Sequence, residues 1–179
     1  MKKCNEVMTK NPVCCLPSDI ASKVALLMKS KNIGPVPIIE NEQTKKLVGI
    51  VTDRDLALKI VAEGRDPKST KAVEVMTREV VTCRAEDDMQ NALDAMSGHK
   101  LRRIPVVDNN NRIVGIIAQA DVATRVDQPE KTAAVVRGIS QSNYSTGVRV
   151  RGLINLIRTS RLRHALRLEA RLSFGRSHG

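Results

Sequence analysis

Residues 47–55 read Leu-Val-Gly-Ile-Val-Thr-Asp-Arg-Asp, and residues 113–121 read Ile-Val-Gly-Ile-Ile-Ala-Gln-Ala-Asp. In both stretches a short apolar run with a central glycine leads directly to an aspartate at the expected start of a helix. Further out, Val7-Met8-Thr9 recurs as Val75-Met76-Thr77. The matching residues keep the same order and nearly the same spacing over this length, which indicates an internal repeat. An internal repeat predicts that the fold is built from two similar units.

The repeat divides the chain into four parts. We assign residues 1–64 to copy one, 65–72 to a linker, 73–136 to copy two and 137–179 to a basic tail. One copy alone leaves much apolar surface exposed. We therefore expect an α+β fold of two β-α-β-β-α repeats, packed sheet to sheet about a pseudo-two-fold axis with related clefts on either side.

Apolar spacing predicts the elements within each copy. We expect the first helix of copy one to be capped by Ser18 or Asp19, and that of copy two by a capping box of Asp87 and Gln90. A second helix is expected to follow the last strand of each copy. The expected strands are residues 11–15, 36–39 and 47–51 in copy one, and 80–83, 104–107 and 113–117 in copy two.

Composition excludes several classes of protein. No apolar run is long enough to span a membrane, and no apolar stretch follows the charged first residues, so we expect a cytoplasmic protein without a secretory signal. Residues 1–136 contain no aromatic residue, which argues against a base-stacking platform for single-stranded nucleic acid. The four cysteines have no CxxC spacing, so we expect free thiols and no metal site.

The tail carries most of the formal net charge of +11. Residues 137–179 hold nine arginines, no lysine and one acid, Glu169, and residues 140–147 resemble a flexible linker. Leucines beyond it recur at roughly helical spacing, which is typical of a basic amphipathic helix, and such a helix can bind an anionic membrane surface, a nucleic acid or a groove on a partner. A disordered extension and a segment created by expression or a shifted reading frame are the other interpretations.

The repeated pattern resembles a tandem pair of CBS (cystathionine β-synthase) domains over residues 5–127. The residues that carry the resemblance are 7–9, 35–39 and 49–55 in copy one, and 75–77, 102–108 and 115–121 in copy two. It implies a stand-alone, non-catalytic regulatory module that binds adenosine-type ligands (AMP, ADP, ATP, NAD or S-adenosylmethionine) and forms a homodimer. The occupancy of its sites would be passed to an unidentified downstream protein.

Polar candidates lie where the last strand of each copy meets the next helix. A carboxylate in a first helical turn, such as Asp55, can accept hydrogen bonds from two sugar hydroxyls, and backbone N–H groups there suit phosphate oxygens. The resemblance assigns the ribose to Asp55 and phosphate to Thr52, with Asp53 in the same turn. Alternatively, these three residues only cap the helix. Copy two keeps Asp121 but has Ala118 in place of the hydroxyl, which predicts a weaker site.

Basic and apolar residues complete the expected sites. Arg102 and Arg103 are placed by the resemblance against phosphate, whereas the simpler interpretation is a solvated charge run. The resemblance also implies an apolar slot for adenine in each site, although every slot residue could equally belong to the core. The slot residues are Val13, Cys15, Ile33, Val36 and Pro37 in one site, and Val81, Cys83, Leu101, Ile104 and Pro105 in the other.

No catalytic constellation is evident, because the three histidines have no recognisable nucleophile or acid partner. The sequence therefore predicts a ligand-binding regulatory module rather than an enzyme. The alternative is a dimeric binder of nucleic acid or anionic membrane surfaces that acts through the arginine-rich tail.

Overall fold

A computed structural model describes residues 2–125, 133, 137 and 138 of the chain. The interpretations of the tail as a linker, an amphipathic helix or a binding segment concern residues that, apart from 137 and 138, lie outside the described ones. Within the described part, no helix is long and apolar enough to cross a membrane.

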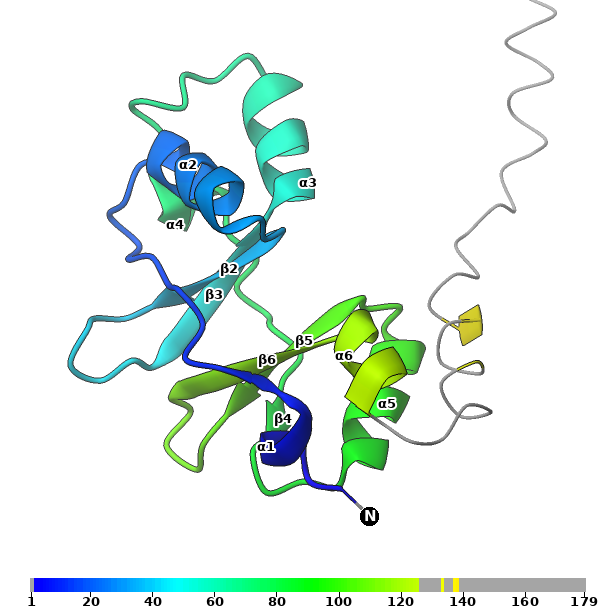
Figure 1. The fold of residues 1–179 in the computed structure, drawn as a ribbon. Helices are drawn as coiled ribbons and strands as arrows, with labels where there is room; N and C mark the ends of the chain where they lie inside the picture. Colours follow the sequence, from blue (N-terminus) through cyan, green and yellow to red (C-terminus); the bar gives the residue numbers. More distant parts are fainter. Residues whose placement is uncertain (1, 126–132, 134–136, 139–179) are drawn as a thin grey trace, which may run out of the picture. The chain divides into compact units, whose positions relative to one another are not determined.

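The chain alternates short helices and strands, and the two halves follow the same order (Figure 1). The elements are α1 (Cys4–Val7), β1 (Thr9–Lys10), α2 (Ala21–Lys31), β2 (Pro35–Ile39), β3 (Leu47–Thr52), α3 (Asp53–Leu56), the π-helix η1 (Ala57–Val61), α4 (Ala72–Val75), β4 (Cys83–Arg84), α5 (Met89–Gly98), β5 (Arg103–Val107), β6 (Ile113–Ala118) and α6 (Gln119–Arg125). The mixed α+β class and the repeat order are confirmed.

The two central strand pairs are equivalent in register as well as in sequence. Strands β2 and β3 are antiparallel with Pro35 opposite Thr52, and β5 and β6 are antiparallel with Arg103 opposite Ala118. In both β3 and β6 every second residue is buried, which is the pattern of a strand with one face against a core. The expected strand pairs are therefore confirmed.

The segment that begins each copy joins the sheet of the other copy. Strand β1 pairs with β6, with Thr9 opposite Ile116, and Figure 1 shows the N-terminal segment running beside β6. In the same way Thr77, just after α4, exchanges backbone hydrogen bonds of 3.0 and 2.8 Å with Ile50 in β3. We call α1 with β1, and α4 with residues 76–77, the leading segments.

Each leading segment packs a methionine onto a glycine of the strand that it joins. Met76 lies against Gly49, and Met8 lies against Gly115, so closely that a Cβ atom on either glycine would overlap the thioether. The two glycines at the centre of the repeated motif therefore permit a close approach of side chain to strand.

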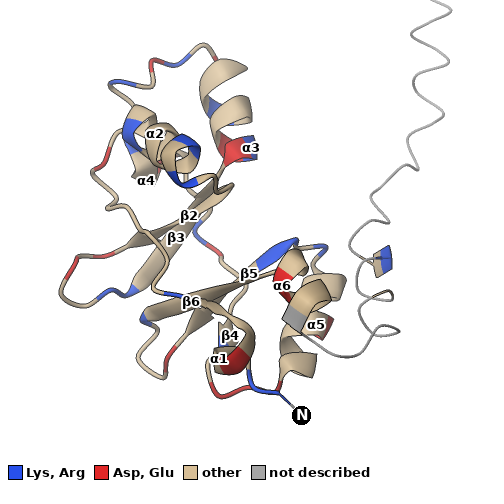
Figure 2. Ribbon diagram, in the orientation of Figure 1, with Lys and Arg blue, Asp and Glu red and all other residues tan. Residues whose placement is uncertain are grey.

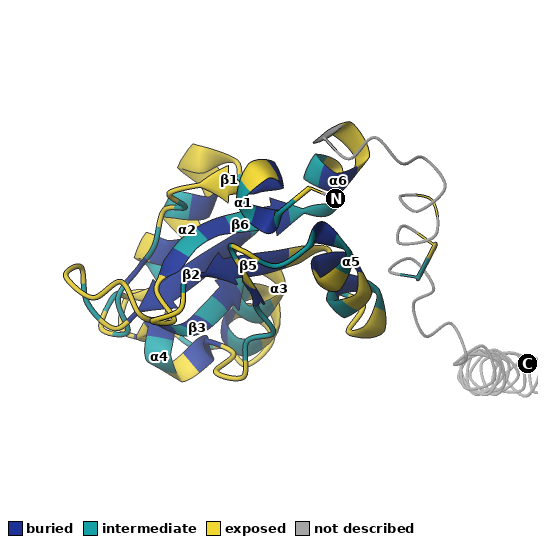
Figure 3. Ribbon diagram, turned by 90° about the horizontal axis from the view of Figure 1, so that it is seen from below, coloured by how far each residue is buried: buried dark blue, intermediate teal, exposed yellow. Residues whose placement is uncertain are grey.

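Two apolar cores result, one for each copy. Figure 3 shows buried positions along the central strands β2, β3, β5 and β6. The core of copy two contains Val7 and Met8 from the first leading segment, beside residues of α5, β5 and β6. The core of copy one contains Val75 and Met76 from the second leading segment, beside residues of α2, β2 and β3. Each core is thus completed by the segment that begins the other copy.

The expected helix caps are wrong. Helix α2 has Ile20 at its N-cap without a side-chain cap, because the Asp19 carboxylate accepts a hydrogen bond from the Leu16 N–H at 2.8 Å. The N-cap of α5 is Asp88, and the carboxylate of Asp87 instead accepts the Arg84 N–H at 2.8 Å. Both aspartates thus stabilise the turn before the helix, an alternative use that short polar side chains commonly find.

The expected first strand of copy one, residues 11–15, is wrong: β1 covers residues 9–10, and of the expected strand only Cys15 forms an isolated parallel bridge, to Ile38. In copy two β4 covers residues 83–84, so it overlaps the expected strand of residues 80–83 only at Cys83. Asn11 has a φ of 51°, and this left-handed conformation interrupts the extended chain between β1 and Cys15.

Candidate functional site

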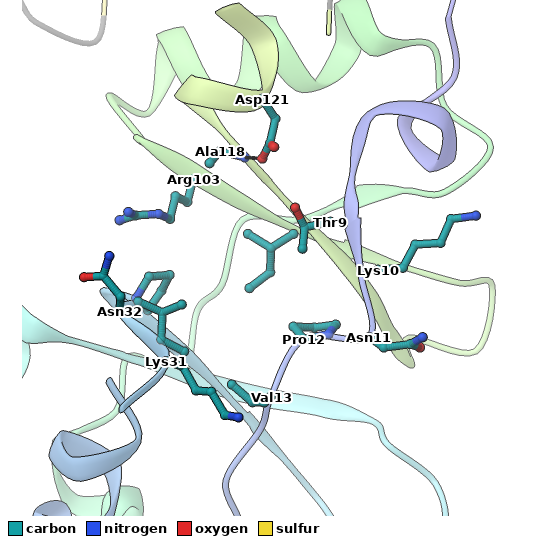
Figure 4. A pocket seen from close by; sticks show the side chains of 13 residues that line it. Thr9, Lys10, Asn11, Pro12, Val13, Lys31, Asn32, Arg103, Ala118 and Asp121 are labelled. Carbon is teal, nitrogen blue, oxygen red and sulfur yellow. Dashed lines mark hydrogen bonds between the residues drawn. The ribbon is translucent and has the colours of Figure 1, made fainter. Parts of the chain in front are cut away.

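A cavity of about 310 Å³ lies between the two copies (Figure 4). Copy two supplies the start of β5, the end of β6 and the start of α6, whereas copy one supplies β1, the end of α2 and the start of β2. We call this cavity the Asp121 pocket. Its lining residues are Thr9, Lys10, Asn11, Pro12, Val13, Lys31, Asn32, Ile33, Pro35, Arg103, Ile116, Ala118 and Asp121.

Asp121 is held at one side of this pocket by the turn from β6 into α6. Its Oδ2 atom accepts a hydrogen bond of 2.8 Å from the backbone N–H of Ala118, the last residue of β6. The residue is half-buried, and Figure 4 shows the hydroxyl of Thr9 pointing toward the same side. A carboxylate and a hydroxyl that face one cavity provide an acceptor for sugar hydroxyls and a donor for a further polar group.

Arg103 extends from copy two toward copy one. A Cβ atom at Gly34 would lie 3.0 Å from Nη1 of Arg103 and 3.6 Å from Oδ2 of Asp53, so the guanidinium passes directly over this glycine. Arg103 begins β5, and Figure 4 shows its side chain beside Asn32. Of the two candidate arginines, Arg103 lines the pocket and Arg102 does not.

The apolar part of the lining is contributed mainly by copy one. Val13 and Ile33, two residues of the expected adenine slot, lie in the Asp121 pocket together with Pro12 and Pro35. The structure therefore brings Asp121 of copy two and two of the five slot residues of copy one to one cavity. The repeat alone does not show which residues of the two copies share a cavity.

The remaining slot residues lie outside this pocket. Val36 and Ile104 are fully buried, and Cys15 and Cys83 are 2% and 5% exposed in the two cores. Burial raises the pKa of the Cys15 thiol to about 11, so this thiol is neutral and packs as an apolar group. Pro37 and Pro105 are buried, and Val81 and Leu101 are half-buried beside the core of copy two.

The equivalent aspartate of copy one, Asp55, already has partners on both oxygens. Its Oδ2 accepts the N–H and the hydroxyl of Thr52, at 2.9 and 2.6 Å, in a capping box. Its Oδ1 lies 2.8 Å from the ammonium of Lys59, which also donates to the carbonyl of Val75. The helix-capping role that the sequence offered for Thr52 and Asp55 is thus present in the structure, and Asp53 is exposed in the same turn.

These contacts make stability depend on Asp55 in acid. Burial alone would raise the pKa of Asp55, but hydrogen bonds from Lys59 and Thr52 outweigh it and hold the pKa below its usual range. Its stabilising effect is thus complete above about pH 4 and is lost as the pH falls through the lower folded-state value. We expect Asp55→Asn to lower the free energy of unfolding by about 1–2 kcal/mol at pH 7.

Urea denaturation at pH 7 and at pH 3 measures this effect. The difference between wild type and Asp55→Asn should shrink at pH 3, whereas Asp94→Asn, at an exposed position on α5, should change little at either pH. A difference that is the same at both pH values would contradict the assigned contacts.

Sequence reasoning missed most of the polar lining. Lys31 and Asn32 end α2, and Asn32 has a left-handed φ of 52° that turns the chain toward β2. Thr9 and Lys10 form β1, and Asn11 follows it. Thr9 ends the repeated Val-Met-Thr triplet, so the repeat drew attention to this residue. The repeat did not indicate that Thr9 lines a cavity.

Comparison with known proteins defines the class of this fold. The family model of the CBS domain matches residues 4–62 and 72–127. The chain therefore belongs to the CBS domain family, and such paired domains are regulatory ligand-binding modules.

Particular relatives cover most of the described chain. The CBS domain-containing protein YhcV of Bacillus subtilis is 35% identical over 143 residues, which is 80% of this chain and 99% of that protein. Hypoxic response protein 1 of Mycobacterium tuberculosis is 30% identical over 128 residues, 72% of this chain and 87% of that protein.

Two solved structures are similar in fold. Hypoxic Response Protein I with two coordinated zinc ions has a TM-score of 0.64 at 30% identity, over 70% of this chain and 99% of that one. The CBS domain pair of MJ0100, in complex with 5-methylthioadenosine and S-adenosyl-L-methionine, has a TM-score of 0.62 at 28% identity, over 70% and 95%. Among the described residues of this chain, no group of three or more His, Cys, Asp or Glu side chains is placed to hold a metal ion.

Proposed function

We propose that this chain is a non-catalytic regulatory module that binds an adenosine-containing ligand (AMP, ADP, ATP, NAD or S-adenosylmethionine) in the Asp121 pocket. The observation that carries the proposal is the union, in one cavity, of the Asp121 carboxylate from copy two and the apolar residues Val13, Ile33 and Pro35 from copy one. A carboxylate suits the paired hydroxyls of ribose, and the apolar wall suits a flat base.

The volume and the position of the pocket agree with this role. A cavity of about 310 Å³ lies at the lower end of the range for small-molecule sites. Because both copies contribute to the lining, a ligand bound there contacts both. It therefore favours the arrangement of the copies that it fits best, which is how occupancy becomes a signal.

We also propose a homodimer that acts on a downstream protein. Leu26 on α2, and Leu58 and Val61 on η1, are 65%, 49% and 78% exposed in the single chain, and such apolar side chains suit a protein partner. Asp55 and Asp121 occupy equivalent positions in the two copies. This equivalence supports a second, related site at Asp55 in copy one.

Calorimetric titration of the full chain with the five ligands tests the proposed function. We expect at least one ligand to bind and to raise the melting temperature. Asp121→Asn should weaken that binding by more than tenfold, because an amide loses the charge that strengthens hydrogen bonds to hydroxyls. Asp94→Asn is the matched control and should leave affinity unchanged. If the ligand binds Asp121→Asn as tightly as wild type, the assignment of the pocket is wrong. The affinity of Asp55→Asn then tests whether the ligand binds at the related site in copy one.

A further inference from the structure

Two of the four cysteines lie together in the core of copy two. Cys4 begins α1 in copy one and Cys83 begins β4 in copy two, so the two residues are far apart in the sequence. Both thiols belong to the same buried cluster, in which Cys4 is fully buried and Cys83 is 5% exposed. The pair therefore joins the first leading segment to the copy whose core it completes.

Polar contacts hold the start of α1 against the residues that follow Cys83. The N–H of Cys4 donates to the carbonyl of Asp87 at 3.0 Å. The ammonium of Lys3 lies 2.8 Å from the carboxylate of Asp88, and Figure 2 shows the basic residues ahead of α1 near the acidic residues ahead of α5. Both thiols are free, so these contacts keep Cys4 in place without a covalent link to copy two.

A hydrogen bond between the two thiols distinguishes them from the other cysteines. It lowers the pKa of Cys4 below the usual range of a thiol and raises the pKa of Cys83, which keeps its proton. Burial raises the pKa of Cys14 and of Cys15 to about 11. Because the thiolate is the form that reacts with oxidants, Cys4 is the most reactive of the four cysteines once an oxidant reaches it.

We propose that Cys4 and Cys83 form a reversible disulfide in the presence of a hydroperoxide, and that this cross-link fastens the first leading segment to copy two. The inference does not rest on the proposed function, because it concerns the core and not the ligand. The fastened segment continues into β1, which supplies Thr9 and Lys10 to the lining of the Asp121 pocket. Oxidation of the pair therefore fixes one part of that lining.

The reaction balances in two steps. The Cys4 thiolate attacks the O–O bond of the hydroperoxide and becomes a sulfenic acid, while the other oxygen leaves as an alcohol or as water. The sulfur of Cys83 then attacks the sulfur of Cys4, so that the S–S bond forms, the S–O bond breaks and the Cys83 proton leaves with hydroxide as water. The two thiols lose two electrons, which reduce the hydroperoxide. A dithiol reverses the step by exchange.

A small oxidant reaches the buried pair when α1 opens. This helix has four residues, its N-cap Lys3 makes no side-chain cap, and Lys2 before it is exposed. Elements this short open locally at a much lower cost in free energy than the whole fold. When the helix closes again, the two sulfurs return to contact, which favours the disulfide over further oxidation of Cys4.

Hydrogen peroxide treatment of the full chain tests the proposal, followed by alkylation of the remaining thiols and peptide mapping without reductant. We expect one cross-linked pair of peptides that contains Cys4 and Cys83 of the same chain and that dithiothreitol separates. Cys14 should remain open to alkylation. The oxidised chain should melt about 5 °C or more above the reduced chain, because a cross-link between distant residues restricts the unfolded state.

Variants show whether the shift in melting temperature comes from this pair. Cys4→Ala and Cys83→Ala should each lose both the cross-linked peptides and the peroxide-dependent shift. Cys14→Ala is the matched control and should keep the full shift. Cys14 is half-buried and therefore more accessible than either proposed residue, so it also reports whether oxidation simply follows exposure.

Several results would overturn the proposal. Peroxide could leave both Cys4 and Cys83 open to alkylation, or it could oxidise Cys4 to a sulfinic acid without a cross-link. The cross-linked peptides could also join two chains, or Cys14 could react in place of the pair. Peptide mapping of the wild type detects each of these results, so the test does not depend on whether the variants fold. A chain that binds none of the adenosine ligands would leave this proposal unaffected.

Discussion

Val7→Asp is expected to open the sheet of copy two, and Val75→Asp the sheet of copy one. Val7 belongs to copy one in the chain, yet it is fully buried in the core of copy two, and Val75 of copy two is fully buried in the core of copy one. A buried carboxylate without a partner costs several kcal/mol. We expect each substitution to lower the free energy of unfolding by more than about 3 kcal/mol.

Hydrogen exchange read by mass spectrometry distinguishes the two sheets. Val7→Asp should first raise the exchange of amides in β5 and β6, and Val75→Asp that of amides in β2 and β3. Asn91→Asp is the control, because Asn91 is exposed on α5 and a charge there remains in water. If Val7→Asp instead loosened β2 and β3 first, the exchange of leading segments between the copies would be refuted.

Gly115→Ala is expected to destabilise copy two through Met8. A Cβ atom at this position would meet the Sδ, Cγ and Cβ atoms of Met8, whose side chain is 9% exposed within the core and has little space to move into. Overpacking of this kind costs about 1–3 kcal/mol. Chemical denaturation measures the loss, which should appear as a lower midpoint with an unchanged slope.

A double-mutant cycle shows whether Met8 is the cause. Met8→Ala removes the atoms that the new methyl group would meet, so the loss in Met8→Ala with Gly115→Ala should be smaller than the two single losses together. Gly98→Ala, in α5 where a Cβ atom meets nothing within 4 Å, should leave stability unchanged or slightly raised. If the losses of stability in the two single variants simply add in the double variant, contact with Met8 is not the cause of the destabilisation by Gly115→Ala.

Much of the fold could be predicted because it follows local rules. The repeat of residues 47–55 at 113–121 indicated two equivalent units, and alternation of apolar residues gave the four long strands within one or two residues of their bounds. The predicted helix caps were wrong because the carboxylates of Asp19 and Asp87 can accept a hydrogen bond either from the helix or from the turn before it. Local sequence does not determine which of the two hydrogen bonds forms.

The candidate site could be predicted in part. Asp121, Arg103, Val13 and Ile33 were named from the sequence and lie together in one pocket. Lys31 and the residues of β1 were missed. A lysine at a helix end and a two-residue strand are common at exposed positions, and only the packing of the two copies shows that they line a cavity.

The amino-acid sequence was enough to predict two copies of one unit, the two central strands of each copy, and the aspartate that ends each repeated motif. These features follow from side-chain periodicity within short segments and from the similarity of one stretch of sequence to another. The folded structure was needed to show that each leading segment completes the opposite core and that Asp121 shares a pocket with apolar residues of copy one. Both depend on contacts between residues that are far apart in the chain, such as Val7 with the core of copy two, and no local pattern specifies the partner in such a contact.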